Sequence, residues 1–319
     1  FINMDTAGSG GVLKLSNTAN TFTVSKITTN RGVLAISGDG SLGASTNTLF
    51  LDNTSLNGGL RFDENNINIA HPVQFGDYAR INVNGKTGAE ISSNITGSTG
   101  NRTLPYTISG GVLKLSGTNT FYHNVDVASG ATLQLGNASA LGTAVSGATD
   151  GTKVSSGGML DLNGQSVGAE SLSLSGTGIS SGGALVNSSG TAASHTGTVA
   201  LAADSSIGGT GDTSLSGAVS GAFALTKSGS GKLTLSGTNT YTGPTNITAG
   251  TLALSGTGSI SSSSIIVGAS TTFDVSGVTG GYSLASGQTI SGTGLVTGAV
   301  TINRSEEHTS ELQSLTTIS

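Results

Sequence analysis

The chain has 319 residues, a formal net charge of −5 and no cysteine. Charged residues make up 9% of it, against about 25% in typical soluble domains, whereas glycine occupies 52 positions. The sequence shows no basic cluster that would hold nucleic acid, and no uninterrupted apolar run of about 18 residues that would form a membrane-spanning helix. With 34% hydrophobic residues the chain can still pack a core, so disorder is not expected.

A Leu-x-Leu or Leu-x-Ile frame returns along most of the chain. Two apolar residues on either side of a polar one are typical of a short strand with one buried face. The frame predicts that its leucines point inward and that the residues between them, such as Lys114, Gln134 and Thr234, point outward. The frame occurs at Leu13/Leu15, Leu34/Ile36, Leu49/Leu51, Leu113/Leu115, Leu133/Leu135, Leu160/Leu162, Leu172/Leu174, Leu233/Leu235 and Leu252/Leu254.

Longer copies of one motif surround three of these frames. They read GGVLKLSNTANTF at 10–22, GGVLKLSGTNTF at 110–121 and SGKLTLSGTNTY at 230–241. Each copy is followed by a second and a third apolar segment. The second segments are Phe22–Val24, Val125–Val127 and the surroundings of Ile247, and the third are Arg31–Ile36, Ser129–Leu135 and Ala249–Leu254.

The step from the first to the third segment predicts a solenoid. It is 21 residues from Leu13 to Leu34, 20 from Leu113 to Leu133 and 19 from Leu233 to Leu252. A βαβ unit needs roughly 30 residues, so the step indicates a coil of short strands that stack in parallel, about 4.8 Å apart. We therefore expect an all-β solenoid of roughly 20-residue coils, about fifteen of them in a rod roughly 70 Å long. Gly and Asn supply the left-handed positions that its corners need.

Residues 225–260, LTKSGSGKLTLSGTNTYTGPTNITAGTLALSGTGSI, resemble the autotransporter-associated β-strand repeat of bacterial autotransporter passenger domains. Residues 197–209 and 60–75 resemble segments that lie between such repeats, and the resemblance extends over 1–303. It implies a right-handed parallel β-helix at, or released from, the surface of a Gram-negative cell. It also implies an outer-membrane β-barrel translocator as a partner, which this sequence does not include. This repeat carries no catalytic, cofactor-binding or metal-binding residues.

The alternative function is that of a carbohydrate-active β-helical enzyme. Glycoside hydrolysis needs two carboxyl groups about 5–10 Å apart. The most charged stretch is the one place where such a pair is expected, although its residues also suit solvated loop and outward positions beside inward Leu60/Phe62, Ile67/Ile69 and Ile81/Val83. The stretch contains Arg61, Asp63, Glu64, His71, Asp77, Arg80, Lys86 and Glu90.

The other polar residues favour structural roles. His71, His123 and His195 lack the spacing of a zinc site and are expected at the surface. The Gly-x-Gly triplets at 176–178, 209–211 and 292–294 precede no expected helix, which excludes a phosphate loop, and the calcium-binding glycine-rich nonapeptide is absent.

Two asparagines follow the repeated Leu-x-Leu-Ser-Gly-Thr frame. Asn119 and Asn239 could stack in amide ladders, with the aromatic residues Phe121 and Tyr241 covering corners of the coil. Four tyrosines are expected to be exposed, where they could contact sugars or proteins, but they are scattered and define no site. These are Tyr78, Tyr106, Tyr122 and Tyr282.

The composition changes sharply near the end of the chain. Residues 304–314, RSEEHTSELQS, carry four charged side chains, and no glycine occurs in 304–319. The string resembles the translation of a common sequencing-library adapter, so we predict a passenger fragment at 1–303, with internal repeats near 10–53, 110–144 and 225–260, and a non-native tail at 304–319. A polar cap helix is the alternative, since Ser305 followed by two glutamates is typical of a helix start. The first residue, Phe1, also indicates an internal fragment.

The sequence therefore predicts a non-enzymatic passenger region, exported to the cell surface or beyond, that acts as an adhesive stalk or spacer. Its ligand, whether a host, cell-surface or glycan molecule, is not identified by any motif. The alternatives are the carbohydrate-active enzyme and an inert structural matrix component. Convergent carboxylates in a groove would favour the enzyme, and a continuous flank of Thr, Ser and Asn would favour the stalk.

Overall fold

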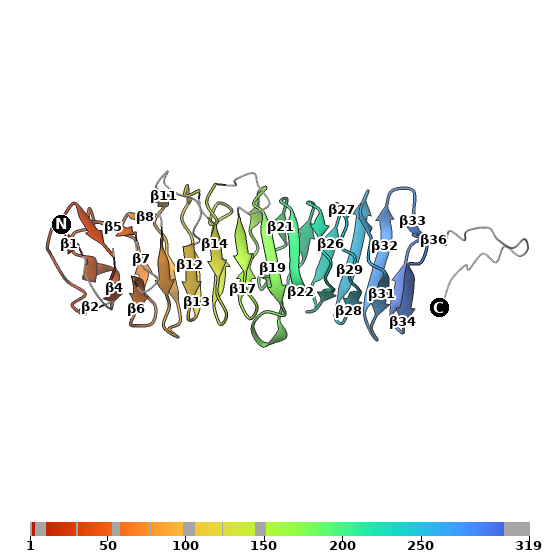
Figure 1. The fold of residues 1–319 in the computed structure, drawn as a ribbon, viewed down its shortest axis with the longest axis horizontal. Coiled ribbons are helices and arrows are strands. Elements are labelled where there is room, and N and C mark those ends of the chain that lie inside the picture. The colour runs from red at the N-terminus through yellow and green to blue at the C-terminus, as the bar shows by residue number, and fades with distance from the viewer. Residues whose placement is uncertain are drawn as a thin grey trace, which may run out of the picture.

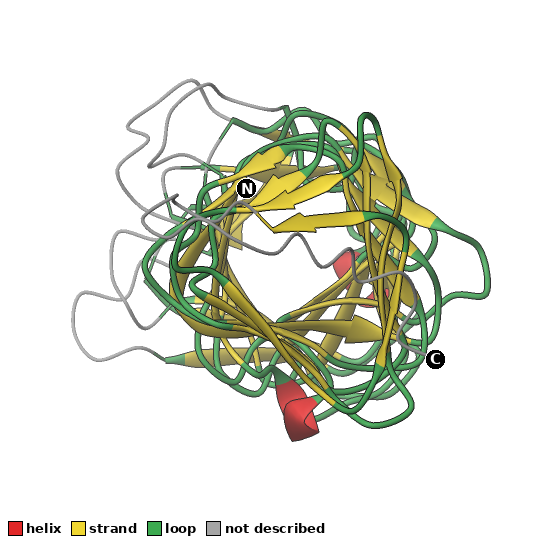
Figure 2. Cartoon of the chain, turned by 90° about the vertical axis from the view of Figure 1, so that its right-hand side faces the viewer, coloured by secondary structure: helices red, strands yellow, loops and turns green. Residues whose placement is uncertain are grey.

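The computed structural model describes residues 2–3, 11–29, 31–52, 58–76, 78–97, 106–122, 124–143 and 151–302. They form a rod in which the strands of successive coils stack along the long axis (Figure 1). About 12 turns follow one another at a spacing of about 22 residues, and every strand pairing is parallel. The predicted all-β solenoid is confirmed. Viewed along the rod, the strands lie on three sides of each coil (Figure 2).

The first face is a ladder of parallel strands that covers most of the coils and is followed by two separate strand pairs. Up to β24 (Val219–Ser220) each strand pairs with the equivalent strand of the next coil. Beyond it, β27 (Thr238–Asn239) pairs with β30 (Ser259–Ile260), and β33 (Tyr282–Leu284) pairs with β36 (Val300–Ile302). The strands of this face are β2 (Val12–Leu15), β4 (Val33–Ile36), β6 (Gly59–Phe62), β9 (Arg80–Asn82), β12 (Tyr106–Ser109), β14 (Val125–Val127), β16 (Thr152–Val154), β19 (Leu172–Gly176), the start of β22 (Val199–Gly209), β24, β27, β30, β33 and β36.

The second face follows the first in each coil. The long strand β22 bends from one face to the other, so it pairs with β19 on the first face and with β20 on the second. The strands of this face are β7 (Asn68–Ile69), β10 (Ala89–Ile91), β13 (Val112–Leu115), β15 (Thr132–Leu135), β17 (Met159–Asp161), β20 (Leu185–Asn187), the end of β22, β25 (Leu225–Lys227), β28 (Thr245–Ile247), β31 (Ser264–Val267) and β34 (Thr289–Gly292).

The third face completes the coil and forms two sheets. The first sheet contains β1 (Ile2–Asn3), β3 (Lys26–Thr28), β5 (Thr48–Leu51), β8 (Val73–Phe75) and β11 (Ile95–Gly97). The second contains β18 (Ser166–Val167), β21 (Ala193–His195), β23 (Thr213–Leu215), β26 (Lys232–Leu235), β29 (Thr251–Gly256), β32 (Thr272–Val278) and β35 (Leu295–Thr297).

Two 3-10 helices, η1 (Asp39–Leu42) and η2 (Ile179–Ser181), interrupt the strands of the described residues. Helix η2 follows Gly178, so the Gly-x-Gly triplet at 176–178 does precede a helix, contrary to the prediction, although it has only three residues. It lies in a long connection between β19 and β20. Such connections lengthen the coils, which is why the turns are fewer than the fifteen predicted. No helix in the described part of the chain is both long and apolar enough to span a membrane.

The three copies of the repeated motif lie on three different faces. The first copy provides β2 on the first face, the second provides β13 on the second face, and the third provides β26 on the third face. Their leucines nevertheless pair with the predicted partners, Leu13 with Leu34, Leu113 with Leu133 and Leu233 with Leu252. The motif therefore specifies a strand followed by a corner, and not a fixed place in the coil.

The predicted alternation of inward and outward residues is confirmed along both later copies. Lys114, Gln134 and Thr234 are half-buried between the inward residues. Leu113, Leu115, Leu133, Leu135, Leu233, Leu235, Leu252 and Leu254 are at most 1% exposed. Leu13 is 38% exposed because β2 has a described partner on one side only. The strand predicted at Phe22–Val24 is wrong, since β3 begins at Lys26.

Shortening a stacked leucine should destabilise the solenoid. Leu235 lies between Leu215 and Leu254 in a buried row, so Leu235→Ala should lower the free energy of unfolding by about 2–5 kcal/mol. Thr234→Ala, on the outward side of the same strand, is the matched control and should change it by less than about 0.5 kcal/mol. Urea denaturation followed by circular dichroism measures both. Equal losses in the two variants would mean that the inward and outward sides are assigned wrongly.

Candidate functional site

The charged stretch at 61–90 forms separate ion pairs. On the first face, Arg61 Nε lies 2.6 Å from Asp63 Oδ1, and Lys14 Nζ lies 3.2 Å from Asp63 Oδ2. On the second face, Glu90 Oε1 lies 3.5 Å from Lys114 Nζ and accepts a hydrogen bond from the Ser116 hydroxyl. Asp63 and Glu90 therefore belong to different faces, each with its own cation. The predicted inward residues of this stretch, Leu60, Phe62, Ile67, Ile69, Ile81 and Val83, are buried.

These carboxylates do not suit glycoside hydrolysis. A general acid needs a raised pKa, but the hydrogen bond from Arg61, reinforced by Lys14, lowers the pKa of Asp63 from its ordinary value of 3.8 despite some desolvation. The same contact raises the pKa of Arg61. Of the remaining predicted residues, Glu64 is exposed, Arg80 and Lys86 are half-buried, and Asp77 lies outside the described residues.

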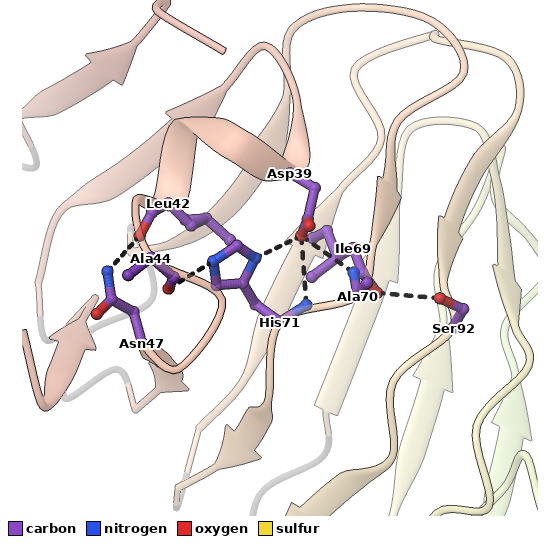
Figure 3. A network of polar contacts seen from close by, with 8 residues as sticks. All are labelled: Asp39, Leu42, Ala44, Asn47, Ile69, Ala70, His71 and Ser92. Atoms are coloured by element: carbon purple, nitrogen blue, oxygen red, sulfur yellow. Dashed lines mark hydrogen bonds and ion pairs between the residues drawn. The ribbon is translucent and has the colours of Figure 1, made fainter. Parts of the chain in front are cut away.

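His71 is buried, contrary to the prediction of a surface residue, and Figure 3 shows it between Asp39 and Ala44. Its Nδ1 lies 2.7 Å from Asp39 Oδ1, and its Nε2 lies 3.0 Å from the carbonyl oxygen of Ala44. Asp39 Oδ1 also accepts the backbone N–H of Ala70 at 3.0 Å.

An Asp–His pair of this kind could form part of a catalytic triad, but the geometry of this pair supports a structural role. In a triad, Nε2 accepts the proton of a nucleophilic hydroxyl, whereas Nε2 of His71 faces a carbonyl oxygen, which has no proton to give. Both ring nitrogens of His71 lie beside oxygen atoms that can accept a hydrogen bond. The contacts connect the turn around η1 to the next coil at β8.

His195 is also buried, again contrary to the prediction, and it occupies an inward position between Val167 and Leu215. Within the described residues neither ring nitrogen reaches a hydrogen-bond partner with good geometry. Burial lowers the pKa of His195 to about 4, and the nearby backbone of Glu170 opposes this only weakly. The ring is therefore neutral in the folded protein near neutral pH. His123 lies outside the described residues.

Glu170, like His195, is a buried titratable residue. It is 5% exposed at the corner before β19, and the Thr152 hydroxyl donates to its Oε1 at 3.5 Å. Burial raises the pKa of Glu170 to about 7, an effect that the Thr152 hydrogen bond reduces. A raised pKa suits a general acid, but this carboxyl group is shielded from any polymeric substrate by the coil itself.

Lys227 is buried in the Leu-x-Lys frame of β25, where alternation places its side chain inward between Ile207 and Ile247. Its ammonium group donates to the carbonyl oxygens of Ser228 at 2.8 Å, Gly229 at 2.8 Å and Ala249 at 3.1 Å. Burial lowers the pKa of Lys227 to about 8. The three acceptors explain how a charged group is tolerated inside the coil. The same alternation that identified the leucines could have identified this residue.

The repeated asparagines connect neighbouring coils through backbone groups. Asn119 Oδ1 accepts from Ile95 N–H at 2.9 Å, and Asn119 Nδ2 donates to Ala140 O at 2.7 Å. Asn239 does the same with Val219 N–H and Ser259 O, at 2.9 and 2.8 Å. The predicted amide ladder is therefore wrong, because each asparagine binds backbone above and below instead of another asparagine.

The aromatic residues after these asparagines fill the interior. Phe121 and Tyr241, which were predicted to cover corners of the coil, are 1% and 0% exposed. Phe121 packs against Phe75 and Tyr106, with ring centroids 5.3 and 5.5 Å away. Tyr106 and Tyr282 are likewise buried, contrary to prediction, whereas Tyr122 is exposed and Tyr78 half-buried. The tyrosines therefore form no shared surface for a sugar.

The outward side of the third face carries a row of hydroxyl groups. Ser166 pairs with Ser194, Ser194 with Ser214, and Ser214 with Thr234. The row continues through Ala253 to Asp274. On the second face, Thr226 and Asn246 are half-buried register partners, whereas Ser206, which pairs with Thr226, is buried. The later coils therefore present a largely uncharged strip on the third face.

The side chains of the described residues form no recognisable metal or cofactor site. In the described ranges, no three His, Asp or Glu side chains lie close enough together to hold a metal ion. Asp161, a buried carboxylate, is surrounded by donors: Ser188 Oγ at 2.6 Å, Gln134 Nε2 at 2.9 Å and the N–H of Asn163 at 3.0 Å. A carboxylate satisfied in this way is an element of the coil corner and has no lone pair turned toward solvent.

Comparison with known families identifies the class of repeat. Residues 225–254 match the family described as the passenger-associated-transport-repeat. They contain the Leu233/Leu235 frame, Lys227 and Asn239, and they run from β25 into β29. The resemblance to autotransporter passenger repeats is thus confirmed for this stretch, and the solenoid of the described residues agrees with it. No curated protein and no solved structure matches the chain.

Two of the buried titratable groups, His195 and Glu170, should give opposite pH dependences of stability. Between about pH 4 and 6.5 the unfolded chain protonates His195 and the folded chain does not, so this residue makes stability rise with pH. Between about pH 4.5 and 7 the folded chain holds a proton on Glu170 that the unfolded chain has lost, so this residue makes stability fall with pH. The two contributions should nearly cancel between about pH 4.5 and 6.5.

Single variants should reveal how each of the two residues makes the free energy of unfolding depend on pH. In Glu170→Gln the free energy of unfolding should rise with pH across this window, and in His195→Leu it should fall, each by up to about 1.4 kcal/mol per pH unit. Urea denaturation at a series of pH values measures this, with the double variant as the control that should again be flat. Slopes of the same sign in both single variants would contradict the assignment of the two buried neutral groups.

Proposed function

We propose that the chain is a non-enzymatic passenger region of an autotransporter-like protein, exported to the cell surface or beyond, where it serves as a stalk. The match at residues 225–254 supports the passenger assignment, because that repeat belongs to exported passengers. Such a region implies a translocator as its partner. The observation that carries the stalk is the coil-to-coil ladder of the second face, which is uninterrupted from β7 to β34, together with the hydroxyl row on the third face of the later coils.

The carbohydrate-active alternative has less support. Its two best carboxylates, Asp63 and Glu90, are on different faces and are held by Lys14, Arg61 and Lys114. A glycosidase would place the pair across one groove. The test is direct: purified protein incubated with polysaccharides should release no reducing ends, and turnover that is lost in Asp63→Asn or Glu90→Gln would overturn the proposal.

A stalk should tolerate the removal of a whole coil but not of part of one. Deleting residues 213–232 places Leu233 at the position of Thr213, its register partner, so every later strand keeps its face. We expect this variant of the full-length protein to be displayed on intact cells as well as the unmodified protein. Deleting 213–221 shifts each later strand to another face and should prevent display.

Display can be measured with an epitope inserted in the exposed connection around η2 and labelled on intact cells. Equal display of both deletions would mean that coil register is not what the protein needs. An adhesive function is a separate outcome of the same assay. Replacing Ser194, Ser214 and Thr234 with lysine would abolish cell binding if the third face is the adhesive surface, and would leave it unchanged in a spacer.

A further inference from the structure

Two turns of the solenoid have the same Asn-Gly sequence and the same backbone geometry. Asn84–Gly85 joins β9 to β10, and Asn163–Gly164 follows β17. Both residues of each pair have positive φ, 56° and 69° in the first turn and 46° and 75° in the second. A backbone hydrogen bond closes each turn, at 3.0 Å in the first and 2.8 Å in the second. This is the type I′ turn that Asn-Gly favours.

Asn-Gly is also the dipeptide in which an asparagine side chain is most readily attacked by its own backbone. The backbone nitrogen of the glycine, which no side chain shields, reaches the Cγ carbon of the asparagine when that amide nitrogen is free and the side chain can rotate toward it. Hydrogen bonds that hold the side chain or the glycine N–H therefore slow the reaction, because they must be broken before the two atoms can meet.

At the second turn, both reacting groups are held, and in opposite directions. Asn163 Nδ2 donates to the Leu135 carbonyl oxygen of the preceding coil at 2.9 Å. Gly164 N–H donates to Asn187 Oδ1 of the following coil at 2.9 Å. Asn187 is itself fully buried, and its Nδ2 donates to the carbonyl oxygens of Thr191 and Asp212, both at 2.8 Å. Because these hydrogen bonds lead to different coils, they hold the Asn163 Cγ carbon and the Gly164 backbone nitrogen apart.

At the first turn, only one of the two groups is held. Gly85 N–H donates to the Gly110 carbonyl oxygen at 2.5 Å. The Asn84 side chain, however, is exposed and makes no hydrogen bond to the residues that the structure describes. A Cβ atom placed on Gly85 would meet nothing within 4 Å, so the space around the turn is open. The Asn84 side chain is therefore free to rotate toward the Gly85 nitrogen whenever that single hydrogen bond opens.

We propose that Asn84 is a site of spontaneous deamidation in the folded protein, whereas the Asn163 turn, which has the same Asn-Gly dipeptide, is protected by its two inter-coil hydrogen bonds. The Gly85 nitrogen loses its proton to solvent base and attacks Asn84 Cγ. The new C–N bond closes a succinimide ring, the Cγ–Nδ2 bond breaks, and ammonia leaves. Water then opens the ring at either carbonyl group, which gives aspartate or isoaspartate.

The product changes an exposed corner of the rod. A neutral amide becomes a carboxylate beside Lys86, and isoaspartate adds one methylene group to the backbone between β9 and β10. Because Gly85 donates to Gly110 in the next coil, the longer backbone disturbs a contact between coils. An exported protein that is not renewed would accumulate this change with age, faster at Asn84 than at Asn163.

The test is peptide mapping by mass spectrometry after the folded protein is incubated at mildly alkaline pH. We expect deamidation at Asn84 to proceed several-fold faster than at Asn163. The same incubation in denaturing urea is the control, and there the two rates should converge, because only the folded structure distinguishes the two turns. A faster or equal rate at Asn163 in the folded protein, or the same ratio of rates in urea, would overturn the proposal.

A variant tests the protecting contact itself. Asn187→Ser removes the acceptor of Gly164 N–H, so the deamidation rate at Asn163 should rise toward that at Asn84 while the Asn84 rate stays unchanged. Hydrogen exchange of the coils around Asn187 shows whether the variant remains folded there, because local unfolding of a solenoid would not reach Asn84. If the deamidation rate at Asn163 is unchanged in a folded Asn187→Ser protein, the hydrogen bond to Asn187 does not protect this turn.

Discussion

The parallel ladder between successive coils is the constraint on which the rest of the structure depends. Each strand hydrogen-bonds to its equivalent one turn away, so each inward side chain rests on the inward side chain of the next coil. The row of Leu215, Leu235 and Leu254 shows the result, three leucines that are at most 1% exposed and stacked in register. A single coil could not bury these residues, because it has a core only when another coil lies above or below it.

This constraint also decides how polar residues are used. An inward polar group finds its partners mainly in the coil above or below. Asn119 and Asn239 do so through backbone groups, and Lys227 donates to the Ala249 carbonyl oxygen of the next coil as well as to two carbonyl oxygens of its own coil. His195 finds none with good geometry among the described residues and is kept neutral by burial. Outward residues can bind water instead, so their chemistry varies along the rod. Some form charged pairs, as around Asp63 and Glu90, and others form the uncharged row from Ser166 to Thr234.

The strands and their pairing could be predicted from the sequence, whereas most polar contacts could not. Period-2 alternation and a step of 19 to 21 residues identified both the inward leucines and their partners, because one repeat unit sets both. The place of each motif copy in the coil was not predictable, since connections such as the one with η2 add residues without changing the strands. The burial of His71 and Tyr106 depends on Asp39 and Phe75, which are 32 and 31 residues away in sequence. The predicted tail at 304–319 lies outside the described residues.

The register of the ladder can be tested by forming disulfides in a chain that has no cysteine of its own. Ser214→Cys with Thr234→Cys joins register partners on the outward side of the third face, at the spacing of adjacent strands, which suits a disulfide. Ser214→Cys with Lys232→Cys is offset by two residues on the same side. The account predicts rapid intramolecular oxidation of the first pair and little of the second, measured by mass spectrometry under mild oxidation. Equal oxidation of both pairs, or faster oxidation of the offset pair, would contradict the stacked register.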